Sequence, residues 1–475
     1  MVFFNPRLIA DSTLQPFLFY FDPPFAYSAK QSEKTDYLRN CQEWVDYLGS
    51  SVRLQEVQEV IYQSSSEQVL DAIHVQHLQD LFPNNIFVKK LLEPKHRDAL
   101  DYLELAMQAE FTHFADTDPW GLNESLLDFK RDIKAVIKTA QNKLKTTKDP
   151  FLTQRYAYQV VLQCRYAGMD ELCLKYCDQY LPLEHPGSVL IPWAQFHKAA
   201  VLTKKKEFAA SAYVLSRVFD LSESKKPRIH LVLDREPLEK AVSLAKTPKE
   251  KATILALLSY KTPGRSLPYL QQIAQLNPAS RYLPQLILRE INKIEDWLLT
   301  AKFTFFGKDE AYGWEGKAAD DYMPIEDRGL WMKEIPYLQK NFKKDLAYLR
   351  QVSSWIEDLL QKPGFPDQNF GHLAAAHLSY LGHQPAQANL HLQKVSARKN
   401  TTDHLQKILT QLLILPDLMD IQSPEAKTQI VQYFYAIRGQ AALLDHKLNI
   451  YPKLMLYFSR LYQKKGDVVT AGLLH

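Results

Sequence analysis

A glutamate and a histidine, Glu110 and His113, are the residues whose types and spacing come closest to a reactive site. They stand three positions apart in a segment with helical periodicity, so a carboxylate and an imidazole share one helix face. This is half of the pattern with which helix bundles hold two iron ions. The one other Glu-x-x-His, Glu93 to His96, contains the helix breaker Pro94. We therefore expect a polar helix face here, and we keep a metal-binding helical protein or enzyme using Glu110 and His113 as an alternative function.

Cysteines and histidines gather in two other places, but without the spacing of metal ligands. Cys173 and Cys177 lie one helical turn apart, and no CxxC or HxxxH pair accompanies them. Four histidines fall in one predicted hairpin: His372, His377, His383 and His391. His372 and His377 would point about 140° apart around a helix, so they do not share a face. We predict reduced, buried cysteines, no metal and no cofactor, and we leave a pH-sensitive groove lined by histidines open as an alternative.

The sequence patterns of common enzymes do not occur in the chain. A phosphate-binding loop needs closely spaced glycines after a strand, and no such stretch is present. There is also no G-x-S-x-G elbow and no Cys/His/Asn arrangement. We assign no catalytic residue and favour a non-enzymatic protein, although catalytic residues drawn from distant helices would leave no linear motif.

The composition is that of an ordinary globular protein. Of 475 residues, 46% are hydrophobic and 24% are charged, and the net charge is +4. This small charge does not require a nucleic acid or an anionic membrane as partner, and no segment is long and apolar enough for a membrane span. The lysines within 143–148 and 204–206 belong to a helix end and a turn. We expect no nucleic acid and keep an RNA-binding helical-repeat protein as a further alternative.

The elements that must position any such residues are predicted to be helical hairpins. The clearest is at the end of the sequence, where Gly466 breaks a helix and a small residue, Ala471, follows five positions later. The preceding helix carries bulky, small and aromatic residues at helical spacing: Met455, Phe458, Ser459 and Tyr462. This pattern is typical of a tetratricopeptide repeat (TPR), in which the second helix packs a small residue into a slot on the first. The glycine supplies the positive φ that ends the first helix.

Looser hairpins of the same kind are predicted upstream. Residues 151–180 turn at Gly168, residues 189–220 have Lys206 where a turn glycine is expected, and a third hairpin turns at Gly382. We predict an N-terminal domain (1–148), in which a segment rich in aromatic residues, the aromatic strap, precedes the first helices. TPR-like hairpins follow (149–300), and then an insertion loop for which disorder is left open (301–335). The last predicted region consists of TPR-like hairpins that end inside a repeat (336–475). With 15 glycines and no strand pattern, the predicted fold class is all-α: an N-terminal helical domain followed by an irregular TPR-like α-solenoid.

Three short phrases resemble a large, uncharacterised family of bacterial helical-repeat proteins. They are FFNP at 3–6, DPW at 118–120 and LILREINKIEDWLL at 286–299. The resemblance implies helical repeats but no activity and no functional residue, because none is established for the family. Its members usually carry an export signal, and the opening MVFFNPRLIAD lacks a basic region followed by an apolar run. We expect a cytoplasmic protein if the sequence is complete and a cell-envelope protein if an export signal has been trimmed.

The concave face of the predicted solenoid is the remaining candidate site. Counting back from the turn glycines places six residues on that face: Arg155, Tyr158, Arg165, His372, Arg460 and Gln463. Arginines there could hold acidic side chains or a terminal carboxylate. We therefore predict a scaffold or adaptor that binds a protein or peptide along this peptide-binding groove. Self-assembly through repeat ends that lack a polar cap is a further possibility, and the oligomeric state stays open.

Overall fold

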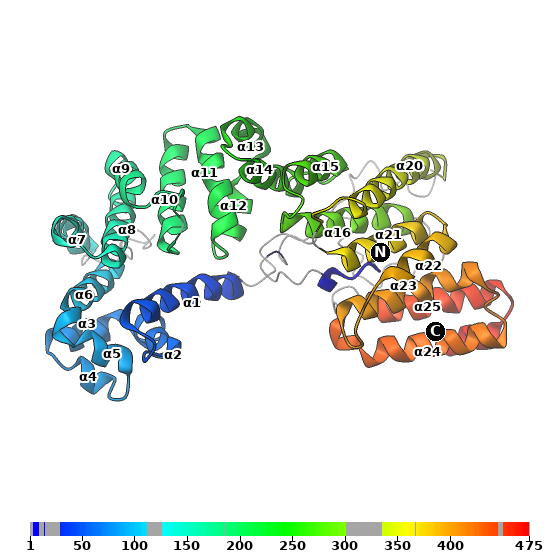
Figure 1. The fold of residues 1–475 in the computed structure, drawn as a ribbon, viewed down its shortest axis with the longest axis horizontal. Coiled ribbons are helices and arrows are strands. Elements are labelled where there is room, and N and C mark those ends of the chain that lie inside the picture. Colours follow the sequence, from blue (N-terminus) through cyan, green and yellow to red (C-terminus); the bar gives the residue numbers. More distant parts are fainter. Residues whose placement is uncertain are drawn as a thin grey trace. The chain divides into compact units, whose positions relative to one another are not determined.

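The computed structural model describes residues 3–8, 14, 29–111, 126–185, 187–300, 335–365, 367–444 and 450–474. Every regular element in these residues is a helix (Figure 1). The prediction of an all-α protein is confirmed over this part of the chain. The few glycines and the long stretches with helical periodicity are the physical reason, since neither favours sheet structure.

The chain divides into two compact units. Residues 24–257 form one, which we call the contiguous unit, and residues 1–23 with 258–475 form the other, the discontinuous unit. The division falls inside the helix α14 (Pro248–Tyr260). The predicted domain limits after residues 148 and 300 divide the chain differently and stay predictions. Of the predicted insertion loop at 301–335, all but Ile335 lies outside the described residues.

The contiguous unit begins with the long helix α1, and its short helices lie both before and after two pairs of longer helices. In chain order its elements are α1 (Ala29–Leu48), α2 (Leu54–Gln58), η4 (Glu59–Gln63), α3 (Ser66–His74), α4 (Leu78–Leu81), α5 (Ile86–Leu91), η5 (Pro94–His96), α6 (Arg97–Phe111), α7 (Leu126–Thr146), α8 (Pro150–Tyr166), α9 (Asp170–Tyr180), α10 (Leu190–Lys204), α11 (Phe208–Leu221), α12 (Lys226–Val232), α13 (Arg235–Ala241), η7 (Val242–Leu244) and the start of α14. Helix α8 pairs with α9 and α10 with α11, and α8 also packs on α10.

The discontinuous unit is built around one buried helix, α16. Its described elements are η1 (Pro6–Leu8), the end of α14, α15 (Leu267–Leu276), α16 (Tyr282–Glu295), η8 (Asp296–Thr300), α20 (Ile335–Leu360), α21 (Gln368–Leu381), α22 (Pro385–Lys394), α23 (Thr402–Leu418), α24 (Pro424–Gly439), η9 (Ala441–Leu443), α25 (Ile450–Lys464) and α26 (Val468–Leu474). Thirteen of the 14 residues of α16 are buried, and they include six with charged or amide side chains: Gln285, Arg289, Glu290, Asn292, Lys293 and Glu295.

Four helical hairpins share one turn geometry: α8–α9, α10–α11, α21–α22 and α25–α26. In each, one residue has φ between +57° and +81°: Gly168, Lys206, His383 and Gly466. The N–H of the next residue bonds back over five positions, with N···O distances of 2.8–2.9 Å, in the pairs Met169–Cys164, Glu207–Leu202, Gln384–Ser379 and Asp467–Tyr462. This is the Schellman ending of a helix. In the third hairpin the left-handed residue is His383 and not Gly382, where we expected the turn, because Gly382 has φ −82°.

The four hairpins also share a small residue five positions after the left-handed one. These residues are Cys173, Ser211, Ala388 and Ala471, and none is more than 6% exposed. A small side chain at this place allows the second helix to approach the first closely.

Candidate functional site

The six residues predicted for the groove fall in both units. Arg155, Tyr158 and Arg165 lie on α8 in the contiguous unit, whereas His372 lies on α21 and Arg460 and Gln463 on α25 in the discontinuous unit.

The structure places Arg155 in a buried position instead of on an open face. Its side chain is 2% exposed, and its guanidinium carbon lies 4.1 Å from the ring centre of Phe151 and 4.7 Å from that of Trp44. Nη1 donates to Asn40 Oδ1 at 2.9 Å, and Nη2 lies 3.4 Å from Glu43 Oε2. Helix α1 covers this face of α8, and the periodicity of α8 alone could not predict that. Arg155 therefore joins two helices and is not accessible to a ligand.

Tyr158 and Arg165 are both half-buried on α8. Tyr158 packs against Val189, Leu190 and Trp193, with its ring centre 6.1 Å from that of Trp193. Burial raises the pKa of the Tyr158 phenol well above its usual value, so the group stays neutral.

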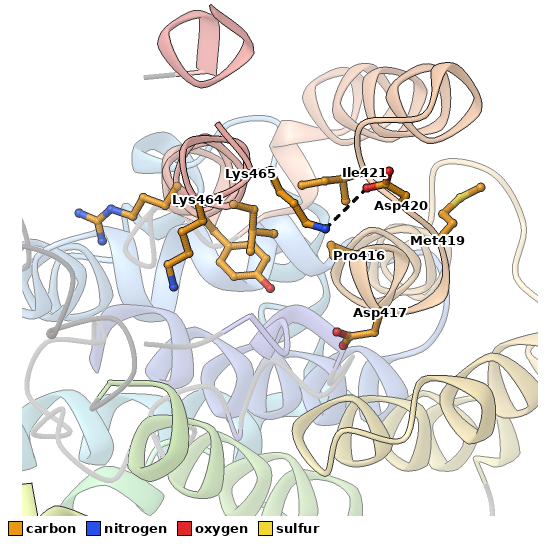
Figure 2. Close-up of a pocket in the computed structure, with 10 residues that line it drawn as sticks. Pro416, Asp417, Met419, Asp420, Ile421, Lys464 and Lys465 are labelled. Atoms are coloured by element: carbon orange, nitrogen blue, oxygen red, sulfur yellow. Dashed lines mark ion pairs between the residues drawn. The ribbon is translucent and has the colours of Figure 1, made fainter. Parts of the chain in front are cut away.

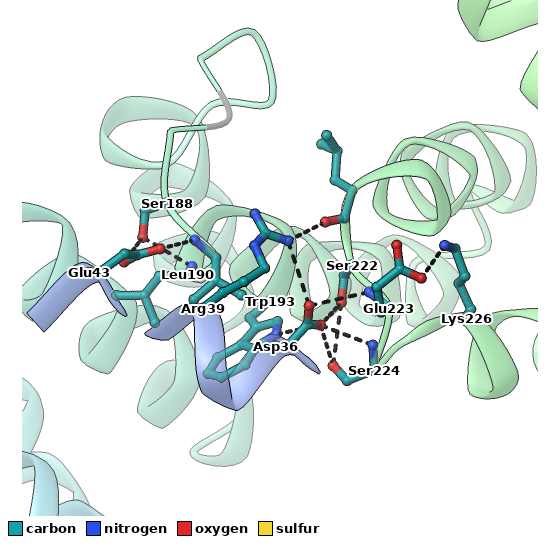
Figure 3. Close-up of polar contacts among 12 residues, drawn as sticks. Asp36, Arg39, Glu43, Ser188, Leu190, Trp193, Ser222, Glu223, Ser224 and Lys226 are labelled. Atoms are coloured by element: carbon teal, nitrogen blue, oxygen red, sulfur yellow. Dashed lines mark hydrogen bonds and ion pairs between the residues drawn. The ribbon is translucent and has the colours of Figure 1, made fainter. Parts of the chain in front are cut away.

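One face of α1 binds the ends of helices in the same unit (Figure 3). The buried Asp36 carboxylate accepts hydrogen bonds from Ser222 Oγ and Ser224 Oγ, both at 2.6 Å, and from Ser224 N at 3.0 Å. Burial raises the pKa of Asp36, but the hydrogen bonds from both serines and from Trp193 lower it below its usual 3.8. Asp36 thus holds the loop after α11 as a charged acceptor.

The next two turns of α1 complement two helix dipoles. Glu43 accepts from Val189 N at 2.6 Å and from Ser188 Oγ at 2.8 Å, at the start of α10. Arg39 Nη1 donates to Leu221 O at 2.9 Å, at the end of α11 (Figure 3). An anion at a helix N-terminus and a cation at a C-terminus are both the favourable arrangement. Sequence analysis missed these roles, because the partners lie about 145 to 190 residues away.

A hollow of about 300 Å³ lies between the end of α23 and the last turns of α25 (Figure 2). It is lined by Pro416, Asp417, Met419, Asp420, Ile421, Tyr457, Arg460, Leu461, Lys464 and Lys465. Two hydrogen bonds fix the position of α25 beside it: Tyr462 Oη donates to Ile421 O at 3.0 Å, and Gln422 Nε2 donates to Lys465 O at 3.2 Å. Of the predicted groove residues, Arg460 lines this hollow and Gln463 is exposed on the same helix.

The hollow is lined by both charged and apolar residues. Arg460, Lys464 and Lys465 bring positive charge and Asp417 and Asp420 negative charge, and Lys465 Nζ lies 3.7 Å from Asp420 Oδ1 (Figure 2). Burial raises the pKa of Tyr457 to about 12, so this phenol stays a hydrogen-bonding neutral group. Such a site suits an acidic group attached to an apolar body, as in a peptide.

Two of the four clustered histidines meet at a junction of three helices. The Nδ1 atoms of His372 and His391 lie 3.2 Å apart, and His391 Nε2 lies 2.6 Å from Glu357 Oε1 on α20. Burial, followed by the nearby His391 and Lys394, lowers the pKa of His372. The other two histidines have different places: His377 is fully buried and His383 forms the turn.

A second, larger hollow of about 720 Å³ lies between α15 and α20, lined among others by Arg265, Tyr348 and Trp355. Behind it, the buried Glu290 on α16 accepts from Ser266 N at 2.9 Å and from Tyr348 Oη, and its other oxygen lies 2.9 Å from Lys293 Nζ. Burial lowers the pKa of Lys293, and the carboxylate of Glu290 opposes that shift. The signal available in the sequence is a Glu and a Lys three positions apart in a helix, between the apolar residues Leu288, Ile291 and Ile294.

The residues predicted as a possible metal site are only partly described. Glu110 is exposed and accepts a hydrogen bond from Ser66 Oγ, and His113 lies outside the described residues. Among the side chains that the structure describes, no group of three or more His, Cys, Asp or Glu could hold a metal ion. All four cysteines are buried free thiols, and burial raises the pKa of Cys41 and of Cys164 to about 12. These two thiols are therefore poor nucleophiles, and the burial of all four cysteines agrees with the prediction of buried thiols.

In the described ranges, none of the helices has the length and apolarity needed to cross a membrane. Comparison with protein-family models, with curated proteins and with solved structures yields no match to the chain. The resemblance to the bacterial helical-repeat family stays a prediction.

Proposed function

We propose that the protein is a non-enzymatic scaffold or adaptor, which binds a protein or peptide along an irregular TPR-like α-solenoid. The support is the shared construction of four hairpins, each with the same left-handed turn and a small buried residue five positions later. Hairpins of this kind bury their apolar faces by stacking, and the array then presents an extended surface to a partner.

The hollow between α23 and α25 is the proposed contact site in the discontinuous unit. The observation that carries this assignment is that Arg460, Lys464 and Tyr457 line the same hollow as apolar side chains, which include Ile421 and Leu461. An arginine can bind a carboxylate through two parallel hydrogen bonds, and the apolar lining residues can contact a neighbouring aliphatic side chain. The ligand we propose is an acidic peptide, with its carboxylates on the α25 cations.

Binding to an array of acidic peptides, each with a free or an amidated C-terminus, tests this proposal. We expect the double variant Arg460→Glu, Lys464→Glu to lose binding at least tenfold, because each change replaces attraction with repulsion. The matched control is Gln429→Glu, Gln432→Glu, which adds negative charge at two exposed positions of α24 that do not line the hollow and should bind nearly as the native protein does. Binding that is unchanged in the double variant, or lost equally in the control, would contradict the assignment. Arg155 is unsuitable for such a test, since its replacement would disturb the core.

A further inference from the structure

The first described residues of the chain are buried in the discontinuous unit. Phe3, Phe4 and Asn5 are each 0% exposed. The backbone N–H groups of Phe3 and Phe4 donate to the two carboxylate oxygens of Glu295, at 2.6 and 3.2 Å. The partners lie more than 290 positions apart in the sequence, and the residues of the whole contiguous unit come between them in the chain.

The next residues continue these contacts with two other elements. Asn5 N donates to Gln406 Oε1 on α23 at 2.8 Å, and Asn5 Nδ2 donates to Leu443 O on η9 at 3.0 Å. Arg7 donates through Nη1 to Ala442 O, also on η9, and through its backbone N to Asn5 Oδ1. Consecutive backbone groups and two specific side chains are thus recognised by one unit.

An aromatic contact completes the site. The ring centre of Phe4 lies 5.1 Å from that of His377 and 6.1 Å from that of Phe370, both on α21. His377 Nε2 in turn lies 3.2 Å from Glu295 Oε1, and both side chains are fully buried.

The Glu295 carboxylate depends on the segment for both of these hydrogen bonds. Among the described residues, the hydrogen bonds to Glu295 come from the N–H groups of Phe3 and Phe4. Without the segment the buried Glu295 carboxylate would lose these two donors, which is an unfavourable state that another peptide with two successive N–H groups can relieve. The arrangement is that of a receptor with its ligand in place, joined in one chain.

We propose that the discontinuous unit contains a peptide-binding site for a Phe-Phe-Asn-x-Arg segment that ends in one 3-10 turn. Residues 3–8 of this chain are its resident ligand, and the same segment supplied in trans can replace them. The site is distinct from the hollow between α23 and α25, so the two assignments stand or fall separately.

The test uses the full chain with a protease site inserted between residues 15 and 28 and cut after folding. A fluorescent peptide of sequence FFNPRLIA, identical to residues 3–10, is then added in excess. We expect the peptide to bind saturably and the cut fragment to be released. Fluorescence anisotropy measures the binding of the peptide, and mass spectrometry measures the release of the fragment. Retention of the cut fragment against excess peptide for a day would overturn the proposal, because a segment that cannot leave is core and not ligand. Loss of the fragment without uptake of the peptide would overturn it as well.

Changes in the peptide make the result specific without altering the protein. Replacement of the asparagine by alanine should weaken binding roughly tenfold, since it removes the bond to Leu443 O. A peptide of the same composition in scrambled order should not compete. In the protein, Glu295→Gln should weaken binding at least about tenfold, whereas the matched control Glu425→Gln, at an exposed position of α24, should not. Equal binding of the native, alanine and scrambled peptides would show non-specific association and would overturn the proposal even if Glu295→Gln failed to fold.

Discussion

The left-handed turn residue has the same conformation in hairpins that differ in sequence. Substitutions at this position can therefore distinguish the effect of backbone strain on stability from the effect of packing. Gly168 has φ +72°, and a Cβ added there would meet nothing within 4 Å. We expect Gly168→Ala to lower the free energy of unfolding by about 1 kcal/mol through backbone strain alone. Lys206 has φ +63° in the equivalent position, so Lys206→Gly should raise it by up to about 1 kcal/mol. Urea denaturation measures both changes.

The control for this prediction is Gly187, which also has open space around its Cβ position but no positive φ. Gly187→Ala should change the free energy of unfolding by less than about 0.5 kcal/mol. If Gly187→Ala lowered the free energy of unfolding as much as Gly168→Ala does, the positive φ of Gly168 would not be the cause of its loss.

His372 gives the discontinuous unit a pH dependence of known sign. Its pKa in the folded protein lies below the usual value near 6.5, because burial, His391 and Lys394 disfavour its charged form, while Glu357 opposes the shift. As the pH decreases, His372 is therefore protonated at a higher pH in the unfolded chain than in the folded protein. Its contribution to the free energy of unfolding is complete above about pH 6.5 and decreases as the pH falls below that value. The urea midpoint measured from pH 7.5 to 5.5 should fall less in His372→Asn than in the native protein. The exposed His185→Asn should follow the native curve, and identical curves for all three would refute the assignment.

At the scale of the element, α1 holds the ends of α10 and α11 through charged side chains on one face. Asp36→Ala would remove a buried acceptor and leave donors of Ser222 and Ser224 unpaired, so we expect a loss of about 2–4 kcal/mol in stability. Asp46 is exposed on the same helix, and Asp46→Ala should cost less than about 0.5 kcal/mol. Hydrogen exchange should show faster opening around residues 222–229 in Asp36→Ala only. Equal costs for the two variants would mean that α1 does not depend on this contact.

The elements themselves were largely predictable, because a helix and its turn are specified by residues close in sequence. The hairpins that turn at Gly168 and Gly466 lie where the glycines indicated, and Lys206 takes the conformation of the glycine it replaces. The predicted turn residue, Gly382, lies one position before the observed left-handed residue, His383. Glycine is the residue that adopts positive φ most readily, so the sequence favours it. The prediction that Arg155 lies on an open face uses the periodicity of α8 alone. In the structure, α1 covers this residue, and α1 lies more than 100 residues earlier in the chain.

At the scale of the whole molecule, contacts between distant segments could not be predicted from periodicity. The FFNP phrase and the 286–299 phrase, which carried the family resemblance, contact each other through the hydrogen bonds from Phe3 and Phe4 to Glu295. No local pattern pairs residues nearly 300 positions apart, and a buried glutamate in a helix looks like any surface glutamate in the sequence. The candidate hollow at Arg460 was likewise found only in part, since its other wall comes from the end of α23.

The division of the chain predicts how the discontinuous unit behaves when the contiguous unit is removed. A chain that joins residues 1–23 directly to 258–475 retains every contact described for Phe3, Phe4 and Asn5, whereas one that joins 9–23 to 258–475 lacks them. We expect the second chain to be less stable by at least about 3 kcal/mol, because it exposes the surface that two phenylalanines cover and removes two donors from the buried Glu295 carboxylate. Circular dichroism during urea denaturation measures the difference, and a chain with residues 1–8 in scrambled order controls for length and composition. If all three chains unfold at the same urea concentration, the N-terminal segment contributes nothing to the unit. This prediction concerns stability and holds whether or not the segment exchanges with a peptide.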